Sequence, residues 1–241
     1  MIDGDEPRVL VVTGSNRGLG AAIEALALEQ GWKVFGCHRT PPVFPPPESV
    51  RLTSIRMDML DTHSIDRGAS EILRQTSHID FLINNSALSN SSPEVSSDVP
   101  GESELGLSAT GLHNLFQVNS VAPMLLTSRL LTALRRGRRP LILNVSSVRG
   151  SLAQMKEKMK FGYGASKCAL NHLTRNLAFH LKGDNVRVIA VHPGWMRTAL
   201  GGPEAPLDPS DAARALLTMY DSLALQQSGS FLDHRGALMD W

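Results

Sequence analysis

The chain has 241 residues, of which 42% are hydrophobic and 20% charged, and its formal net charge is +1. This composition is typical of a globular protein with a hydrophobic core. A net charge near zero gives no broad attraction to nucleic acid or to an anionic membrane, so we expect neither as a partner. The basic stretch 135–139 falls where a predicted helix ends, and there it complements the helix dipole.

Neither the cysteines nor the start of the chain indicates an extracellular protein. Cys37 and Cys168 lie in apolar stretches, where we expect small buried side chains and neither a disulfide nor a metal site. Residues 1–7 are acidic and polar, unlike a signal peptide. No apolar run approaches the roughly 20 residues that span a bilayer. We therefore expect a cytoplasmic protein.

Short apolar runs alternate along the chain with amphipathic stretches of helix length. The predicted strands are 9–13, 33–37, 50–57, 81–84, 141–145 and 186–191, with residues 231–232 as a candidate edge strand. The predicted helices are 20–30, 62–75, 111–136, 164–181 and 211–225. Continuous apolar strands between helices indicate a parallel sheet covered on both faces. We predict one domain, 1–241, with a doubly wound α/β fold of the Rossmann type in three α/β/α layers.

Two segments interrupt this alternation. Segment 40–49 holds five of the 14 prolines, so it cannot be helical and is predicted to be a surface loop. Segment 89–104 is rich in Ser, Pro, Asp and Glu and is predicted to be a loop excursion and not a linker between domains.

A glycine-rich turn, Thr-Gly-Ser-Asn-Arg-Gly-Leu-Gly at 13–20, joins the first strand to the first helix. A dinucleotide pyrophosphate needs backbone N–H groups that it can approach without a Cβ in the way, at the positive end of a helix dipole. Glycine is also common in tight α/β turns that bind nothing, so this motif alone is weak. The predicted cofactor contacts here are Gly14, Ser15, Asn16, Arg17, Gly18, Leu19 and Gly20.

The residues after the second strand bear on which dinucleotide would bind. An acidic residue at that place binds the ribose hydroxyls of NAD, whereas an arginine accommodates the 2′-phosphate of NADP. Here the chain continues with His38 and Arg39 and has no acid nearby. We predict that Arg39, with Arg17 on its other side, binds the phosphate of NADPH, although either arginine alone is also compatible with a solvated surface position.

A tyrosine and a lysine stand four residues apart, at Tyr163 and Lys167, which puts them on one face of a predicted helix. Tyrosine has an ordinary pKa near 10, and a neighbouring ammonium would lower the pKa toward the range useful for acid/base catalysis. Ser147, after the fifth strand, is placed to hydrogen-bond a substrate carbonyl oxygen. The predicted catalytic residues are thus Ser147, Tyr163 and Lys167.

These motifs resemble those of the short-chain dehydrogenase/reductase family, in family order from about residue 8 to the end of the chain. The resemblance adds Asn119 to the catalytic set, as the asparagine that kinks its helix and holds a proton-relaying water. It also implies that Asp58 contacts adenine and that Thr198 contacts the nicotinamide carboxamide. The remaining cofactor contacts that it implies are Met59, Asn85, Ser86, Tyr163, Lys167, Pro193, Gly194 and Met196.

Two features depart from the family pattern. The family's Asn-Asn-Ala-Gly segment reads Asn-Asn-Ser-Ala at 84–87, which adds a Cβ beside the expected cofactor ribose. The gap between Ser147 and Tyr163 is longer than usual, and we expect its basic insert, 156–160, to loop out at the rim of the active site.

Segments 193–206 and 229–241 resemble the branch that contains sniffer-type carbonyl reductases and bacterial C-factor proteins. This implies an NADPH-dependent carbonyl reductase that transfers hydride between NADPH and a ketone or aldehyde, with a substrate loop near 195–210. Its apolar wall is expected from Trp195, Met196, Leu200, Leu207 and Trp241. Core packing explains Met196 and Leu200 equally well.

Two other functions remain open from the sequence: an NAD-linked alcohol dehydrogenase, and a non-catalytic dinucleotide-binding signalling protein. The family resemblance also implies a homodimer or homotetramer, paired through helices 111–136 and 164–181. The expected partner is otherwise a small carbonyl or alcohol substrate.

Overall fold

The computed structural model describes residues 6–41, 49–95, 108–156 and 161–241. Its centre is a seven-stranded parallel sheet in the order β3-β2-β1-β4-β5-β6-β7. The strands are β1 (Val9–Thr13), β2 (Lys33–His38), β3 (Leu52–Arg56), β4 (Phe81–Asn84), β5 (Leu141–Val145), β6 (Arg187–His192) and β7 (Phe231–Asp233). The predicted doubly wound α/β fold is confirmed.

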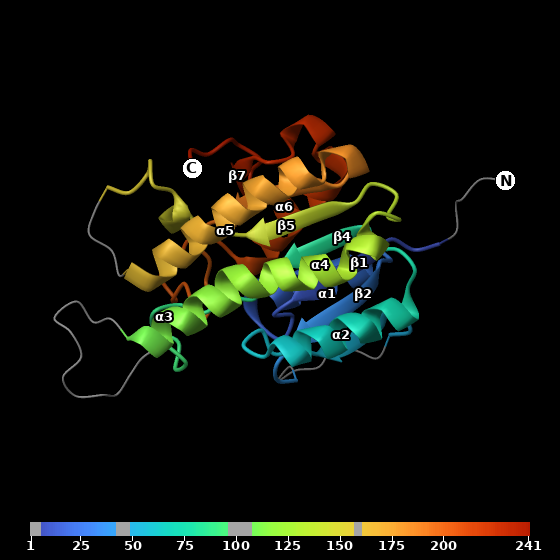
Figure 1. The fold of residues 1–241 in the computed structure, drawn as a ribbon, viewed down its shortest axis with the longest axis horizontal. Helices are drawn as coiled ribbons and strands as arrows, with labels where there is room; N and C mark the ends of the chain where they lie inside the picture. The colour runs from blue at the N-terminus through green and yellow to red at the C-terminus, as the bar shows by residue number, and fades with distance from the viewer. Residues whose placement is uncertain (1–5, 42–48, 96–107, 157–160) are drawn as a thin grey trace.

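Helices cover both faces of the sheet. On one face lie α1 (Gly18–Glu29) and α6 (Pro209–Ser222), and on the other lie α2 (Thr62–Gln75), α4 (Ala122–Leu134) and α5 (Phe161–His180). Figure 1 shows the strand arrows pointing toward the side of the molecule where α5 begins. Within the described residues, no helix has the length and apolar character needed to cross a membrane.

The alternation of side chains along each strand separates two hydrophobic cores. In β1, Val9 and Val11 belong to the core under α2 and α4, whereas Leu10 and Val12 belong to the core under α1 and α6. Because successive side chains of a strand point to opposite faces, an unbroken apolar run is the pattern that a sheet buried on both sides requires.

One predicted helix is interrupted in the structure. Residues 111–136 were expected to be continuous, but α3 (Ala109–Phe116) passes through a π-helical turn, η1 (Gln117–Val121), into α4. Pro123 has no N–H to donate to the carbonyl of Asn119 four residues earlier, so the regular hydrogen-bond ladder cannot continue there. The π-turn brings Asn119 to a fully buried position.

The predicted loops fall partly outside the described residues. Of segment 40–49 only residues 40, 41 and 49 are described, and of segment 89–104 only 89–95. Of the insert 156–160 only Lys156 is described. Helix α5 begins at Phe161, three residues earlier than predicted, so Tyr163 lies inside its first turn.

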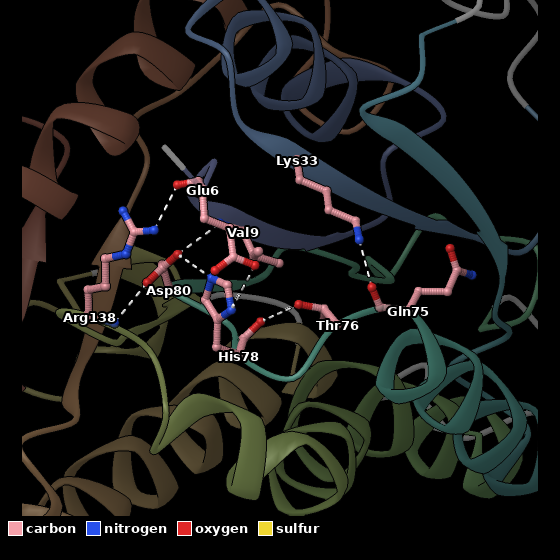
Figure 2. Close-up of polar contacts among 8 residues, drawn as sticks. All are labelled: Glu6, Val9, Lys33, Gln75, Thr76, His78, Asp80 and Arg138. Atoms are coloured by element: carbon pink, nitrogen blue, oxygen red, sulfur yellow. Dashed lines mark hydrogen bonds and ion pairs between the residues drawn. The ribbon is translucent and has the colours of Figure 1, made fainter. Parts of the chain in front are cut away.

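A buried carboxylate holds the amino-terminal ends of three strands together, at the edge of the sheet opposite the start of α5. Asp80, fully buried just before β4, accepts hydrogen bonds from the backbone N–H of Val9 (2.8 Å) and of Arg138 (2.9 Å). Figure 2 shows His78 beside it, with Nε2 3.5 Å from the Asp80 carboxylate. The starts of β1 and β4 and the approach to β5 are thereby held together, whereas the carboxyl ends of the strands lead into a cleft.

Candidate active site

A cleft of about 1110 Å³ opens at the carboxyl ends of β1, β4, β5 and β6. Most of the residues predicted from the sequence line it. They are Gly14, Asn16, Arg17, Gly18, Leu19, Arg39, Asp58, Met59, Asn85, Ser86, Ser147, Tyr163, Lys167, Pro193, Gly194, Met196 and Thr198. The fold therefore brings together motifs that are spread over more than 180 residues of the sequence.

Three of the predicted cofactor-binding and catalytic residues do not line the cleft. The backbone N–H of Ser15 donates to the Cys37 carbonyl (3.2 Å), so it is not directed at a phosphate. Gly20 is packed against the turn, where a Cβ would lie 2.1 Å from the Gly14 carbonyl oxygen. Asn119 is buried beneath the cleft wall. Ser15 and Gly20 thus shape the glycine turn, and Asn119 lies behind the residues that form the cleft wall.

The glycine turn is fastened to the loop after β4. Gly14 and Gly18 have φ values of +69° and +56°, which glycine adopts without strain. The Thr13 hydroxyl accepts hydrogen bonds from the backbone N–H groups of Asn85 and Ser86, each 3.0 Å long. Ala87, at the position of the family's glycine, also lines the cleft. These contacts fix the floor against which a pyrophosphate would lie.

An ion pair stands where the sequence predicts a phosphate site. Nη1 of Arg39 lies 2.6 Å from Oε1 of Glu94, a residue that the sequence analysis did not select. The pKa of Glu94 is lowered, first by a hydrogen bond from its own backbone and further by Arg39 and Arg17. Both predicted phosphate-binding arginines therefore already act on a carboxylate.

Tyr163 is held in place at the start of α5. Its backbone N–H donates to Oδ1 of Asn90 (3.2 Å), and its carbonyl accepts from the Ser166 hydroxyl (2.8 Å). Burial raises the pKa of the phenol, while a hydrogen bond with Ser147 and the charge of Arg149 act to lower it. The Ser147 hydroxyl thus faces the phenol. Arg149, two residues after this serine, is an exposed cation of the cleft wall that the sequence analysis missed.

Lys167 lies behind the tyrosine, on the same face of the helix as predicted. Its Nζ donates to the Val145 carbonyl (2.7 Å) and lies 5.8 Å from the centre of the Tyr163 ring. Only 2% of its surface is exposed, and burial lowers its pKa to about 7. The expected drop in the Tyr163 pKa is not found in this structure, because burial penalises the charged forms of both groups.

Asn119 connects the π-turn to the cleft. Its Oδ1 accepts from the backbone N–H of Leu88 (2.8 Å), and its Nδ2 donates to the Leu88 carbonyl (2.9 Å) and the Ser166 hydroxyl (2.9 Å). A π-turn at a functional site is a recurrent arrangement. Here it fastens the loop after β4 to the helix that carries Tyr163.

A second set of buried contacts positions residues 146–150, the segment that contains Ser147. The Ser146 hydroxyl donates to Oδ1 of Asn171 (2.5 Å), and Nδ2 of Asn171 donates to the Gly150 carbonyl (3.2 Å). Sequence reasoning missed Asn171, although it lies four residues after Lys167 and hence on the same helix face.

The predicted apolar wall is only partly present. Trp195, Met196 and Leu200 line the cleft, and the Trp195 indole donates to the Gly201 carbonyl (2.7 Å). Leu207, like Met196, packs against the core under α1 and α6, but it is not among the residues that line the cleft. Trp241 stacks on Phe231, with ring centres 5.5 Å apart, because the end of the chain folds back onto β7. Leu207 and Trp241 were therefore wrong as cleft residues.

Comparison with known proteins identifies the family. The family model for short chain dehydrogenases matches residues 8–206. The protein FixR of Bradyrhizobium diazoefficiens is 32% identical over 212 residues, which cover 85% of this chain and 72% of FixR. The C-signal protein of Myxococcus xanthus is 35% identical over 126 residues, which cover 52% of this chain and 76% of C-signal.

Solved structures agree with this assignment. A short-chain dehydrogenase/reductase from Burkholderia multivorans with bound NADP has a TM-score of 0.80 and 27% identity, covering 98% of this chain and 100% of that one. The carbonyl reductase Sniffer of Drosophila melanogaster has a TM-score of 0.83 at 24% identity, covering 97% and 99%, and shares the fold. The chain belongs to the short-chain dehydrogenase/reductase family of oxidoreductases.

Proposed function

We propose that this protein is an NADPH-dependent carbonyl reductase that acts on a ketone or aldehyde. The observation that carries the proposal is that Ser147, Tyr163 and Lys167 meet at the wall of the same cleft that contains the glycine turn and Arg39. When bound, NADPH would supply the hydride from C4 of its nicotinamide.

The residues present fit this cofactor. The left-handed conformations of Gly14 and Gly18 leave the turn without Cβ atoms where a pyrophosphate would approach. Arg39 and Arg17 both line the cleft, and their charges act at the same place, where they would attract a 2′-phosphate. No acid follows β2 that would hold the two ribose hydroxyls of NAD. Asp58 and Met59 also line the cleft, and we assign them to the adenine end because the family resemblance implies that Asp58 contacts adenine.

The chain's own side chains divide the remaining chemistry. Ser147 would donate a hydrogen bond to the substrate oxygen, and Tyr163 would deliver its phenolic proton to that oxygen. Lys167 would stabilise the resulting phenolate and hold the nicotinamide ribose hydroxyls. Asn119 positions the tyrosine's helix against the loop after β4 through its contacts to Leu88 and Ser166. The apolar rim from Trp195 and Leu200 favours an uncharged, partly hydrophobic substrate.

The decisive test is Tyr163→Phe, because it removes a single oxygen. We expect kcat for NADPH oxidation with a panel of small ketones and aldehydes to fall by about 10²- to 10⁴-fold, while the Kd for NADPH stays unchanged. The chain has two tyrosines. Tyr220→Phe is therefore the matched control, since Tyr220 packs in α6 against Trp32 and Phe81. Near-full turnover by Tyr163→Phe would end the assignment.

The same assays separate the other two functions. Stronger binding of NADH than of NADPH, with oxidation of alcohols, would indicate an NAD-linked dehydrogenase. Tight NADPH binding without turnover of any carbonyl compound would indicate a dinucleotide-binding signalling protein.

We also propose that the protein forms a homodimer or homotetramer through the face that carries α4 and α5. Large apolar side chains are exposed on α5 and on the helix that leads into α4, namely Phe116, Val121, Phe161 and Phe179. An exposed apolar face of this kind suits a twofold interface. Light scattering on the purified protein tests it, with Phe179→Glu expected to shift the mass toward the monomer.

A further inference from the structure

Glu94 contacts Arg39, a residue of the cleft wall, and is held by a second contact from α3. Its carboxylate lies 2.6 Å from Nη1 of Arg39, and only 21% of the glutamate side chain is exposed. Its carbonyl accepts a hydrogen bond from Nδ2 of Asn114 (2.7 Å), which ties this part of the loop to α3. The ion pair thus joins the end of β2 to the loop after β4 across the adenosine end of the cleft.

The groups that hold Glu94 are those that a 2′-phosphate would need. A guanidinium donates the same fork of N–H groups to a carboxylate or to a phosphate. Arg39 contacts the glutamate directly, and the charge of Arg17 also acts on it. A phosphate placed here would lie next to the carboxylate, and the two negative charges would repel each other.

We propose that Glu94 is a specificity-determining residue, whose carboxylate competes with the 2′-phosphate of NADPH for Arg39. NADPH must break this ion pair in order to bind, whereas NADH, which has no 2′-phosphate, leaves it in place. Arg39 favours NADPH over NADH, and Glu94 therefore reduces this difference in affinity. This inference rests on the cofactor site of the proposed function.

Glu94→Gln tests the competition because it removes the charge and keeps the shape of the side chain. The ion pair is partly exposed, so its energy is modest. We expect the Kd for NADPH to fall by about two- to fivefold and the Kd for NADH to stay nearly unchanged. Glu29→Gln is the matched control. It removes the same charge at an exposed position at the end of α1, away from the glycine turn where this helix begins.

The readout is calorimetric binding to the full chain of two probes that lack nicotinamide, adenosine 2′,5′-bisphosphate and adenosine 5′-monophosphate. Glu94→Gln should strengthen binding of the bisphosphate alone. Weaker bisphosphate binding by this variant would show that Glu94 orients Arg39 for the phosphate, and would overturn the proposal. Equal gains for both probes would do the same, since they would indicate a general charge effect.

A double-mutant cycle ties the effect to the ion pair. In the Arg39→Ala background, Glu94→Gln should increase the affinity for the bisphosphate by less than half as much as it does in the wild-type background. An undiminished increase would overturn the proposal that Glu94 competes with the phosphate for Arg39. If neither the wild-type protein nor Glu94→Gln distinguishes the two probes, the NADPH assignment fails together with this inference. If it does distinguish them and Glu94→Gln has no effect, only the role of Glu94 is lost.

Discussion

Replacing Lys167 with methionine should change how the stability of the protein depends on pH. Lys167 is 2% exposed, and burial lowers the pKa of its amine from 10.5 to about 7. Each pKa unit corresponds to about 1.4 kcal/mol, so the difference of about 3.5 units represents a folding cost of about 5 kcal/mol at low pH.

The sign follows from proton binding. Between pH 7 and pH 10.5 the unfolded chain keeps the lysine proton and the folded protein releases it, so the free energy of unfolding rises with pH. The slope from this one group approaches about 1.4 kcal/mol per pH unit, or about 2 to 3 kcal/mol from pH 7 to pH 9. Below pH 7 both states are protonated, and the full cost is present.

Urea unfolding at pH 6, 7, 8 and 9 measures this dependence. Lys167→Met should be more stable than the wild-type protein at pH 6, with the gap closing as pH rises. The variant leaves the Val145 carbonyl without its donor, a cost of about 1–3 kcal/mol that does not depend on pH. Lys182→Met, at an exposed position, should keep the wild-type slope. If the free energy of unfolding depends on pH in the same way for the wild-type protein and for Lys167→Met, the pKa of the Lys167 amine is not lowered by burial.

Three further substitutions test the cleft and its frame. Arg39→Ala should raise the Kd for NADPH by about 10- to 100-fold, the loss of a charge-assisted contact, and leave that for NADH nearly unchanged; equal losses in fluorescence titrations would contradict a phosphate role. Gly20→Ala places a Cβ 2.1 Å from the Gly14 carbonyl oxygen, so thermal unfolding should show a loss of about 1–3 kcal/mol together with weaker dinucleotide binding. Asp80→Asn weakens a buried acceptor of two backbone N–H groups and should cost about 2–4 kcal/mol in urea unfolding. Because Asp80 lies at the opposite ends of the strands, a large change in NADPH affinity would contradict this separation.

The strands were the most predictable part of the fold. The predicted bounds 9–13, 81–84 and 141–145 coincide with those of β1, β4 and β5. These central strands are buried on both faces, so they must be apolar throughout, and a continuous apolar run can be located by eye. At the sheet edge, where burial is partial, the predicted strand 50–57 shortens to Leu52–Arg56.

The residues proposed to bind the cofactor and to catalyse the reaction could also be selected from the sequence, but their surroundings could not. Spacing places Tyr163 and Lys167 on one helix face, yet it carries no information on burial, and burial decides the pKa of both groups. The contact between Arg39 and Glu94 joins residues 55 positions apart through the path of a loop with no regular pattern. Asp80 could not be singled out among the 23 acidic residues for the same reason.

The loop after β4 contacts the glycine turn, the π-turn, Tyr163 and Arg39. It therefore connects the proposed cofactor-binding groups with the proposed catalytic groups. Asn85 bonds to the glycine turn, and Leu88 bonds to the π-turn. Asn90 accepts from the backbone of Tyr163, and Glu94 pairs with the arginine after β2. A displacement of Glu94 by a phosphate would therefore act on the same loop as Asn90, four residues earlier, which contacts the backbone of Tyr163, the proposed proton donor. If the two are coupled, adenosine 2′,5′-bisphosphate should change the hydrogen-exchange rate of the Tyr163 amide more than adenosine 5′-monophosphate does, and Glu94→Gln should remove that difference.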